Sequence, residues 1–182
     1  SIAERVYGPN LMLQACEMAE TSGFSVFLYG GRAQTLDKLK TNLLKRFPSL
    51  SIAGAYSPPF RSLTPDEEIR IITMINKASP DILFVGLGAP KQEKWMARHC
   101  DRLNVPVTLG VGAAFDFLSG EKRQASIWMQ RRGLEWLYRL LNEPTRLWKR
   151  YLLYNPLFVT LFLGQLIGAR FNVSARKTEH ER

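Results

Sequence analysis

The sequence is poor in the residues on which metal sites, disulfide frameworks and nucleophilic triads depend. Its 182 residues include two cysteines and two histidines. Cys16 and Cys100 match neither a metal-ligand spacing nor a disulfide framework, and this scarcity favours a reducing compartment. Because His99 and the tail residue His180 are the only imidazoles, a zinc site or a Ser-His-Asp triad is disfavoured.

The start of the chain lacks a secretory signal, and the whole chain is short of acidic residues. Ser1 to Gly8 has no initiator methionine and no apolar signal core, so we expect an internal segment of a longer protein. Sixteen Asp and Glu stand against 25 Lys and Arg, a formal charge of +9. This excess favours an anionic partner: nucleic acid, nucleotide phosphates or an acidic membrane surface.

The most informative stretch is 82–95, where an apolar run passes through a glycine turn into a helix. The run Ile82–Val85 has no polar alternation, which is typical of a strand covered on both faces. Gly86 and Gly88 end it, and Lys91–His99 is predicted to be a helix. A Gly-x-Gly pair alone does not separate a phosphate site from an ordinary turn. The following residues, Pro90-Lys91-Gln92-Glu93, favour a ligand site, because they add a cation, an amide and a carboxylate.

Strands and helices are predicted to alternate along the first two thirds of the chain. Strands are expected at 24–29, 50–56, 82–85 and 105–111, and helices at 10–20, 36–47, from Thr64, and at 91–99. This rhythm predicts an α/β fold with a Rossmann-like parallel sheet flanked by helices. Glycine turns follow three strands, at Gly30 and Gly31, Gly86 and Gly88, and Gly110 and Gly112. We expect these turns to line one edge of the sheet.

Asp116 follows the last glycine turn and stands between two phenylalanines. Two roles for this residue are equally compatible with its position. It caps the next helix, or it binds a ribose or sugar hydroxyl or orients a basic residue.

The C-terminal third changes character and is predicted to be a basic amphipathic helical appendage. Trp, Tyr, Leu and Arg recur from Trp128 to Tyr154, as in helices that lie on anionic membranes. A helix packed on the domain with solvated arginines is the alternative. The apolar stretch 151–169 contains Asn155 and Pro156, so we expect it to lie on a membrane or partner rather than to span. The expected domains are 1–126, 127–169 and a disordered tail, 170–182.

Several motifs together resemble the WecG/TagA/CpsF family of bacterial glycosyltransferases, family 26. The motifs occur in order at Glu4–Val6, Gly86–Glu93, Gly110–Gly112 with Phe115-Asp116, Gly120 with Lys122-Arg123, and Gly133–Leu140 with Glu143-Pro144. The resemblance implies an inverting, metal-independent enzyme without a cofactor. It would transfer a sugar from a UDP-sugar to a polyprenyl-diphosphate-linked acceptor in surface polysaccharide synthesis. The implied location is peripheral, at the cytoplasmic face of the bacterial inner membrane, with no nucleic acid as partner and a homo-oligomer left open.

The resemblance also implies roles for individual residues. Arg5 and Gln92 would lie in the active-site pocket, and Arg139, Arg146 and Lys149 would meet the diphosphate of donor or acceptor. The UDP-sugar site would use Asp116, Pro90 and Lys91, with the glycines Gly30, Gly31, Gly86, Gly88, Gly110 and Gly112. The family's proposed catalytic base is an Asp before Glu4, in a segment that this chain does not contain. Either the chain is a fragment or the encoded protein has lost its base; we expect a fragment, because the donor-pocket motifs are otherwise present.

Two other functions compete with the glycosyltransferase. A basic nucleic-acid-binding module would use the Arg and aromatic residues of 128–154 as a stacking surface, but the sequence has no matching motif. An NAD-dependent oxidoreductase would need Gly-x-Gly-x-x-Gly and an acid about 20 residues later, and this pattern is missing.

Overall fold

The computed structural model describes residues 7–142 and 144–179, and the chain divides into two compact units, Ser1–Gln124 and Ala125–Arg182. We call them the first and the second unit. The expected domain boundaries, after 126 and after 169, stay predictions.

The first unit is built on a parallel sheet of four strands in the order β2-β1-β3-β4. The strands are β1 (Ser25–Gly30), β2 (Ser51–Tyr56), β3 (Ile82–Gly86) and β4 (Val107–Gly110). Apolar side chains of β1 and β3 are buried on both faces, as expected for the inner strands of such a sheet. The α/β fold class predicted from the sequence is confirmed.

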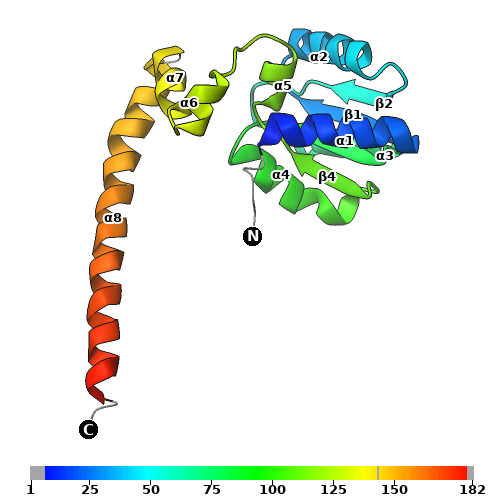
Figure 1. Ribbon diagram of the computed structural model, residues 1–182. Helices are drawn as coiled ribbons and strands as arrows, with labels where there is room; N and C mark the ends of the chain where they lie inside the picture. The colour runs from blue at the N-terminus through cyan, green and yellow to red at the C-terminus, as the bar shows by residue number, and fades with distance from the viewer. Residues whose placement is uncertain (1–6, 143, 180–182) are drawn as a thin grey trace. The chain divides into compact units, whose positions relative to one another are not determined.

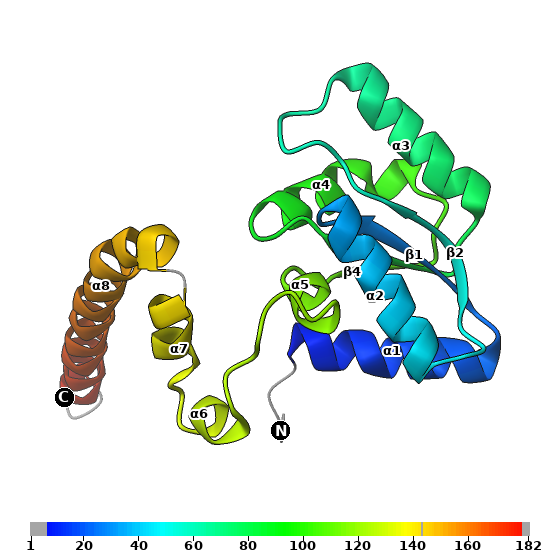
Figure 2. The same cartoon turned by 90° about the horizontal axis from the view of Figure 1, so that it is seen from above.

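Helices cover both faces of the sheet (Figures 1 and 2). The helices are α1 (Gly8–Ser22), α2 (Ala33–Arg46), α3 (Pro65–Ala78), α4 (Lys91–His99) and α5 (Ala114–Leu118), and a short 3-10 turn, η1 (Cys100–Arg102), follows α4. One hydrophobic cluster joins α1, α2 and α5 to the sheet, and a second joins α3 and α4 to it. We call the face of the sheet covered by α1, α2 and α5 the first face, and the face covered by α3 and α4 the second face.

The start of α3 shows how the sequence sets a helix boundary. The Thr64 hydroxyl accepts from the Glu67 amide at 3.3 Å, and the Glu67 carboxylate accepts from the Thr64 amide at 2.9 Å. This capping box satisfies two amide groups that the helix leaves free. Arg61 donates to the same carboxylate, so the pKa of Glu67 falls to about 2.

A carboxylate links the two inner strands at the amino edge of the sheet. Asp81 accepts from the Ser25 amide at 2.7 Å and from the Ser25 hydroxyl at 2.9 Å. These hydrogen bonds hold the pKa of Asp81 below its usual value. Because Ser25 opens β1 and Asp81 precedes β3, the contact sets the register of the central strand pair.

A column of aromatic rings crosses the second face from β2 to α4. Tyr29 stacks on Tyr56 with centroids 6.4 Å apart, Trp95 lies 4.5 Å from Tyr29, and His99 lies 5.1 Å from Trp95. Within the described residues, the Tyr29 hydroxyl, the Trp95 indole N–H and both His99 ring nitrogens are buried without a hydrogen-bond partner. His99 Nε2 stands 3.7 Å from the Glu68 carboxylate.

We expect His99 to make the fold less stable as the pH falls through about 6.5, the value at which an unfolded histidine takes up a proton. Burial lowers the pKa of folded His99, and Arg102 and Arg98 lower it further while Glu68 opposes them. The unfolded chain therefore binds more protons near pH 6, which favours unfolding. Urea unfolding between pH 7.5 and 5.5 should show this slope, and His99→Phe should flatten it.

Carboxylates that accept hydrogen bonds in the folded state change the free energy of unfolding only at lower pH, below about 4.3. Glu67, Asp81 and Glu121 all have lowered pKa values, so their contribution is lost only when they become protonated. An unchanged slope between pH 7.5 and 5.5 in His99→Phe would contradict the assignment to His99.

The second unit is helical in its described part. Its helices are α6 (Ile127–Arg131), α7 (Glu135–Asn142) and α8 (Pro144–Glu179). Gly133, with φ 71°, lies between α6 and α7, so the aromatic and basic segment 128–154 comprises α6, α7 and the start of α8. α8 continues to Glu179, into the range where we expected a disordered tail.

α8 exposes apolar side chains along much of its described length. Large exposed side chains occur at Leu152, Leu153, Tyr154, Leu157, Phe158, Val159, Leu161, Phe162, Leu163 and Leu166. Pro156 lies inside the helix. Among the described residues, no helix is both long and apolar enough to cross a membrane.

Candidate functional site

The three glycine turns predicted from the sequence lie at the carboxyl edge of the sheet. Gly30 at the end of β1 is paired with Gly86 at the end of β3, and Gly110 ends β4 beside Val85. The chain leaves β1 for a helix on the first face and leaves β3 for a helix on the second face. Ligands of open α/β sheets bind where neighbouring strands diverge in this way.

The backbones of β1 and β3 approach each other too closely for side chains at this point. A Cβ atom at Gly30 would lie 2.5 Å from the Gly86 carbonyl oxygen, and φ of Gly30 is +124°. A Cβ at Gly86 would lie 2.6 Å from the Phe115 ring. Glycine is therefore required at both positions.

Phe115 is a residue of the site to which the sequence analysis, which names it only within a motif, gives no role. Its ring is 1% exposed and lies against both Gly31 and Gly86, so it closes the first-face side of the turns. It lies three residues after Gly112 and belongs to the short helix α5. An aromatic residue at that place beside Asp116 was the available signal.

Gln92 lies at the opposite side of the same edge, in the first turn of α4. The carboxamide packs on β4: a Cβ at Gly110 would be 3.0 Å from Nε2, and one at Gly112 would be 3.4 Å from Oε1. Nε2 donates to the Glu93 carboxylate at 3.0 Å. Oε1 is buried and has no hydrogen-bond partner among the described residues. A buried acceptor without a partner costs free energy, so it points to a donor outside the described residues.

The β3–α4 turn presents groups that suit an anion. Gly88 has φ +79° and open space around its Cα, and its carbonyl accepts from the Gln92 amide at 3.0 Å. Pro90 and Lys91, at the first turn of α4, are exposed. The positive end of the helix dipole and the Lys91 ammonium favour negative charge at this position.

Asp116 does not cap a helix, so the first interpretation of this residue was wrong. α5 begins at Ala114, and Asp116 lies inside it, with Ala113 in the capping position. Its carboxylate forms an ion pair of 3.0 Å with Lys122, which fits the interpretation that it orients a basic residue. Binding of a sugar hydroxyl by Asp116 stays a prediction.

The segment after α5 is tied to the first turn of α2. The buried Thr35 hydroxyl donates to Glu121 at 2.7 Å, and Lys38 donates to the same carboxylate at 3.4 Å. These bonds keep the pKa of Glu121 below its usual value. The sequence analysis did not identify either residue, because they are 86 positions apart.

Four predicted site residues cannot be placed in this geometry. Arg5 lies outside the described residues, and the side chains of Arg139, Arg146 and Lys149 are also outside the described part. The backbone places Arg139 in α7 and the other two in α8. Arg139 and Arg146 are therefore not on one continuous helix.

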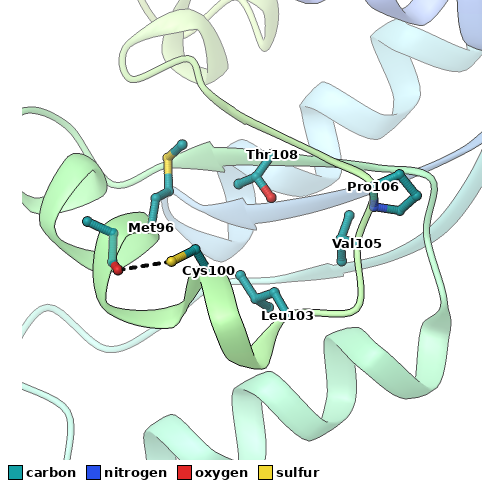
Figure 3. A pocket seen from close by; sticks show the side chains of 7 residues that line it. Met96, Cys100, Leu103, Val105, Pro106 and Thr108 are labelled. Atoms are coloured by element: carbon teal, nitrogen blue, oxygen red, sulfur yellow. Dashed lines mark hydrogen bonds between the residues drawn. The ribbon is translucent and has the colours of Figure 1, made fainter.

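One pocket, of about 390 Å³, lies between α4 and β4 (Figure 3). It is lined by Met96, Ala97, Cys100, Leu103, Val105, Pro106 and Thr108. The Cys100 thiol donates to the Ala97 carbonyl oxygen, and no charged side chain lines the pocket. This apolar pocket does not suit a diphosphate.

Among the described residues no cluster of His, Cys, Asp and Glu could hold a metal, and metal independence stays an expectation.

Comparisons with known proteins agree with the motifs. The profile of the glycosyl transferase WecG/TagA/CpsF family matches residues 1–172. An N-acetylglucosaminyldiphosphoundecaprenol N-acetyl-beta-D-mannosaminyltransferase of Bacillus subtilis (strain 168) is 32% identical over 151 residues, which cover 83% of this chain and 57% of the relative. A protein of the same name from Staphylococcus aureus (strain MW2) is 30% identical over 149 residues, 82% of this chain and 55% of the relative. The chain spans just over half the length of these curated relatives.

Proposed function

This chain belongs to the WecG/TagA/CpsF family of glycosyl transferases, and on that premise we propose that it forms the donor side of a glycosyltransferase site. The enzyme moves a sugar from a UDP-sugar to a polyprenyl-diphosphate-linked acceptor, with inversion at the anomeric carbon. The names of the relatives support an acceptor of this class and an N-acetylmannosaminyl group as the transferred sugar.

The observation that carries this proposal is the unpartnered carboxamide oxygen of Gln92 at the glycine-lined edge. It is a buried acceptor, fixed against the backbone of β4, beside a helix N-terminus and a lysine. A sugar hydroxyl or a uracil N–H would supply the missing donor. The bare glycine backbone leaves room for a diphosphate close to the start of α4.

Departure of UDP places negative charge on the β-phosphate, and cations with helix dipoles stabilise such charge. We assign this task to the α4 N-terminus with Lys91, and to Arg5, Arg139, Arg146 and Lys149. A carboxylate must also accept the proton of the acceptor hydroxyl. We expect that base outside this chain, so the reaction requires polypeptide in addition to these 182 residues.

The test of the function is a transfer assay on the protein expressed from its complete reading frame. The substrates are UDP-N-acetylmannosamine and N-acetylglucosaminyl-diphosphoundecaprenol, without added metal and with EDTA. The expected result is a β-linked disaccharide on the lipid and release of UDP. If neither transfer nor saturable UDP binding is detected, the proposal fails; if EDTA abolishes transfer, metal independence is wrong.

Arg139→Gln with Arg146→Gln should lower transfer by about fivefold or more, roughly 1 kcal/mol in the barrier, because charge-assisted contacts to a diphosphate are lost. Stability, followed by the melting temperature, should change by no more than about 0.5 kcal/mol, because on this proposal the two arginines bind the diphosphate and do not hold the fold. Arg132→Gln, exposed directly after α6 in the same unit, is the matched control and should keep full activity. Full activity in the double variant would return both arginines to a solvated role.

The second unit should bind anionic membranes through the exposed apolar side chains of α8. Phe158 and Phe162 stack with centroids 5.9 Å apart and are both exposed. Replacing both with Gln should lower partitioning onto vesicles that contain phosphatidylglycerol by about tenfold, because apolar area buried in lipid is lost. Thr160→Gln, exposed on the same helix, is the control.

The vesicle experiment also tests the competing class of function. If the double Gln variant pellets with vesicles as the parent does, α8 is not the membrane contact. If the parent instead binds single-stranded oligonucleotides with a steep salt dependence, a nucleic-acid-binding module is favoured.

A further inference from the structure

The edge strand β4, the last strand of the sheet in chain order, has one side without a partner strand in the described structure. Its residues pair with β3 alone. The Val107 amide donates to the Asp81 carbonyl and the Val111 amide to the Val85 carbonyl. Because such hydrogen bonds alternate along a parallel strand, the amide groups of Thr108 and Gly110 face away from β3. They point to the side where the described sheet has no further strand.

The surroundings of this side are apolar. Val107 is 44% exposed, and the pocket of about 390 Å³ between α4 and β4 runs beside the strand (Figure 3). Exposed apolar edges are a hazard for soluble proteins, which usually shorten, blunt or cover them. The opposite edge strand, β2, is blunted by a register shift against β1 and by small residues at Ala53 and Gly54. Pro106 precedes β4, but the described part of β4 has no such irregularity.

The position of α1 shows from which direction a further strand would come. α1 begins at the carboxyl edge of the sheet, where a Cβ at Gly8 would lie 3.0 Å from the Val111 carbonyl oxygen, directly after β4. It ends at Ser22 and is capped by Gly23, two residues before β1 begins. A helix that runs from the carboxyl edge back to the start of a parallel strand is the crossover of a βαβ unit. α1 therefore begins beside the end of β4.

Crossover handedness then selects the edge. In the described sheet, the step from β1 to β2 uses a helix on the first face, and the steps toward β4 use helices on the second face. Crossovers are right-handed in about 98% of cases, so the face of the helix tells the direction of the step. α1 lies on the first face and leads into β1. A strand before α1 must therefore lie on the β4 side of β1, and the first free place there is beyond β4.

We propose that β4 receives a further parallel β-strand from polypeptide on the N-terminal side of α1, giving the order β2-β1-β3-β4-βN. The Thr108 and Gly110 backbone groups pair with it, and its apolar side chains on the second face fill the pocket between α4 and β4. The length of the relatives beyond the matched residues is sufficient for such a strand. Its carboxyl end lies beside Gly110 and thus beside Gln92, so the strand brings new side chains to the candidate site.

Amide hydrogen exchange tests this pairing with a control inside the same strand. The probe is the protein expressed from its complete reading frame, compared with a form that starts at Gly8. The Leu109 amide faces β3 by the same alternation and reports whether β4 is formed. In the complete protein, Thr108 and Gly110 should exchange within about tenfold of Leu109, and in the truncated form at least about a hundredfold faster than Leu109.

Every outcome decides the proposal. Fast exchange of Thr108 and Gly110 in the complete protein, with Leu109 protected, overturns it. Protection that disappears on about tenfold dilution shows a second copy of the chain on β4 and also overturns it. If the truncated form does not fold, the protection pattern and its concentration independence in the complete protein decide alone. The assay does not use sugar transfer, so its result is independent of the proposed function.

Discussion

Gly30→Ala is expected to destabilise the first unit by about 3 kcal/mol or more, the largest stability effect that we predict for a single methyl group. Two costs add at this position. The φ of +124° is strained for any residue with a side chain, and the added carbon would lie 2.5 Å from the Gly86 carbonyl oxygen. That oxygen belongs to the backbone of the central strand β3, so it cannot move aside without disturbing the sheet. Urea unfolding followed by circular dichroism measures the change.

Gly88→Ala is the matched control for this experiment. Its φ of +79° also disfavours a side chain, but nothing lies within 4 Å of the added carbon. We therefore expect it to lose only the conformational contribution, about 1 kcal/mol. Equal losses in the two variants would show that the close contact between the β1 and β3 backbones does not limit this site.

Gln92→Ala is expected to lower glycosyl transfer at least tenfold, roughly 1.4 kcal/mol in the barrier, while the first unit stays folded. The variant removes the buried acceptor that lacks a partner and leaves the Glu93 carboxylate without the Nε2 donor. Because Oε1 has no partner in the described chain, its loss should relieve an unfavourable burial and cost little stability. The measurement is kcat/KM for the UDP-sugar, on the complete protein, beside its melting temperature.

Two further variants separate chemistry from packing at Gln92. Gln92→Glu keeps the size and the acceptor but adds a negative charge, so it should weaken UDP binding as well as transfer. Lys94→Ala, exposed on the next turn of α4, should retain full activity. Wild-type turnover in Gln92→Ala would remove the residue from the site and leave its buried oxygen unexplained.

The sheet and its glycine edge could be predicted from sequence because their signals are local. An apolar run between a turn and a helix start defines β3, and Thr64 with Pro65 and three following acids defines α3. Each glycine turn follows its strand directly, and parallel strands bring their ends to one edge. These features require no knowledge of which distant residues meet.

The rest depends on contacts between residues far apart in the chain. Phe115 fills the space above Gly31 and Gly86, and Thr35 binds Glu121, but neither pairing has a local pattern. Asp116 was ambiguous because a helix of five residues leaves no periodicity to place its boundary. The turn at Gly133 depends on a positive φ, which the residue pattern of 128–154 does not specify.

The bond between Ser25 and Asp81 also constrains the order of events during synthesis. β1 pairs with β2 and β3, and the carboxylate that fixes its register to β3 is 56 residues further along the chain. A ribosome adds about 5–20 residues per second, so β1 waits several seconds for its central partner β3. During this interval β1 has an unpaired edge toward β3. Nascent chains stalled before residue 81 should therefore be the species that chaperones capture and that aggregates most readily.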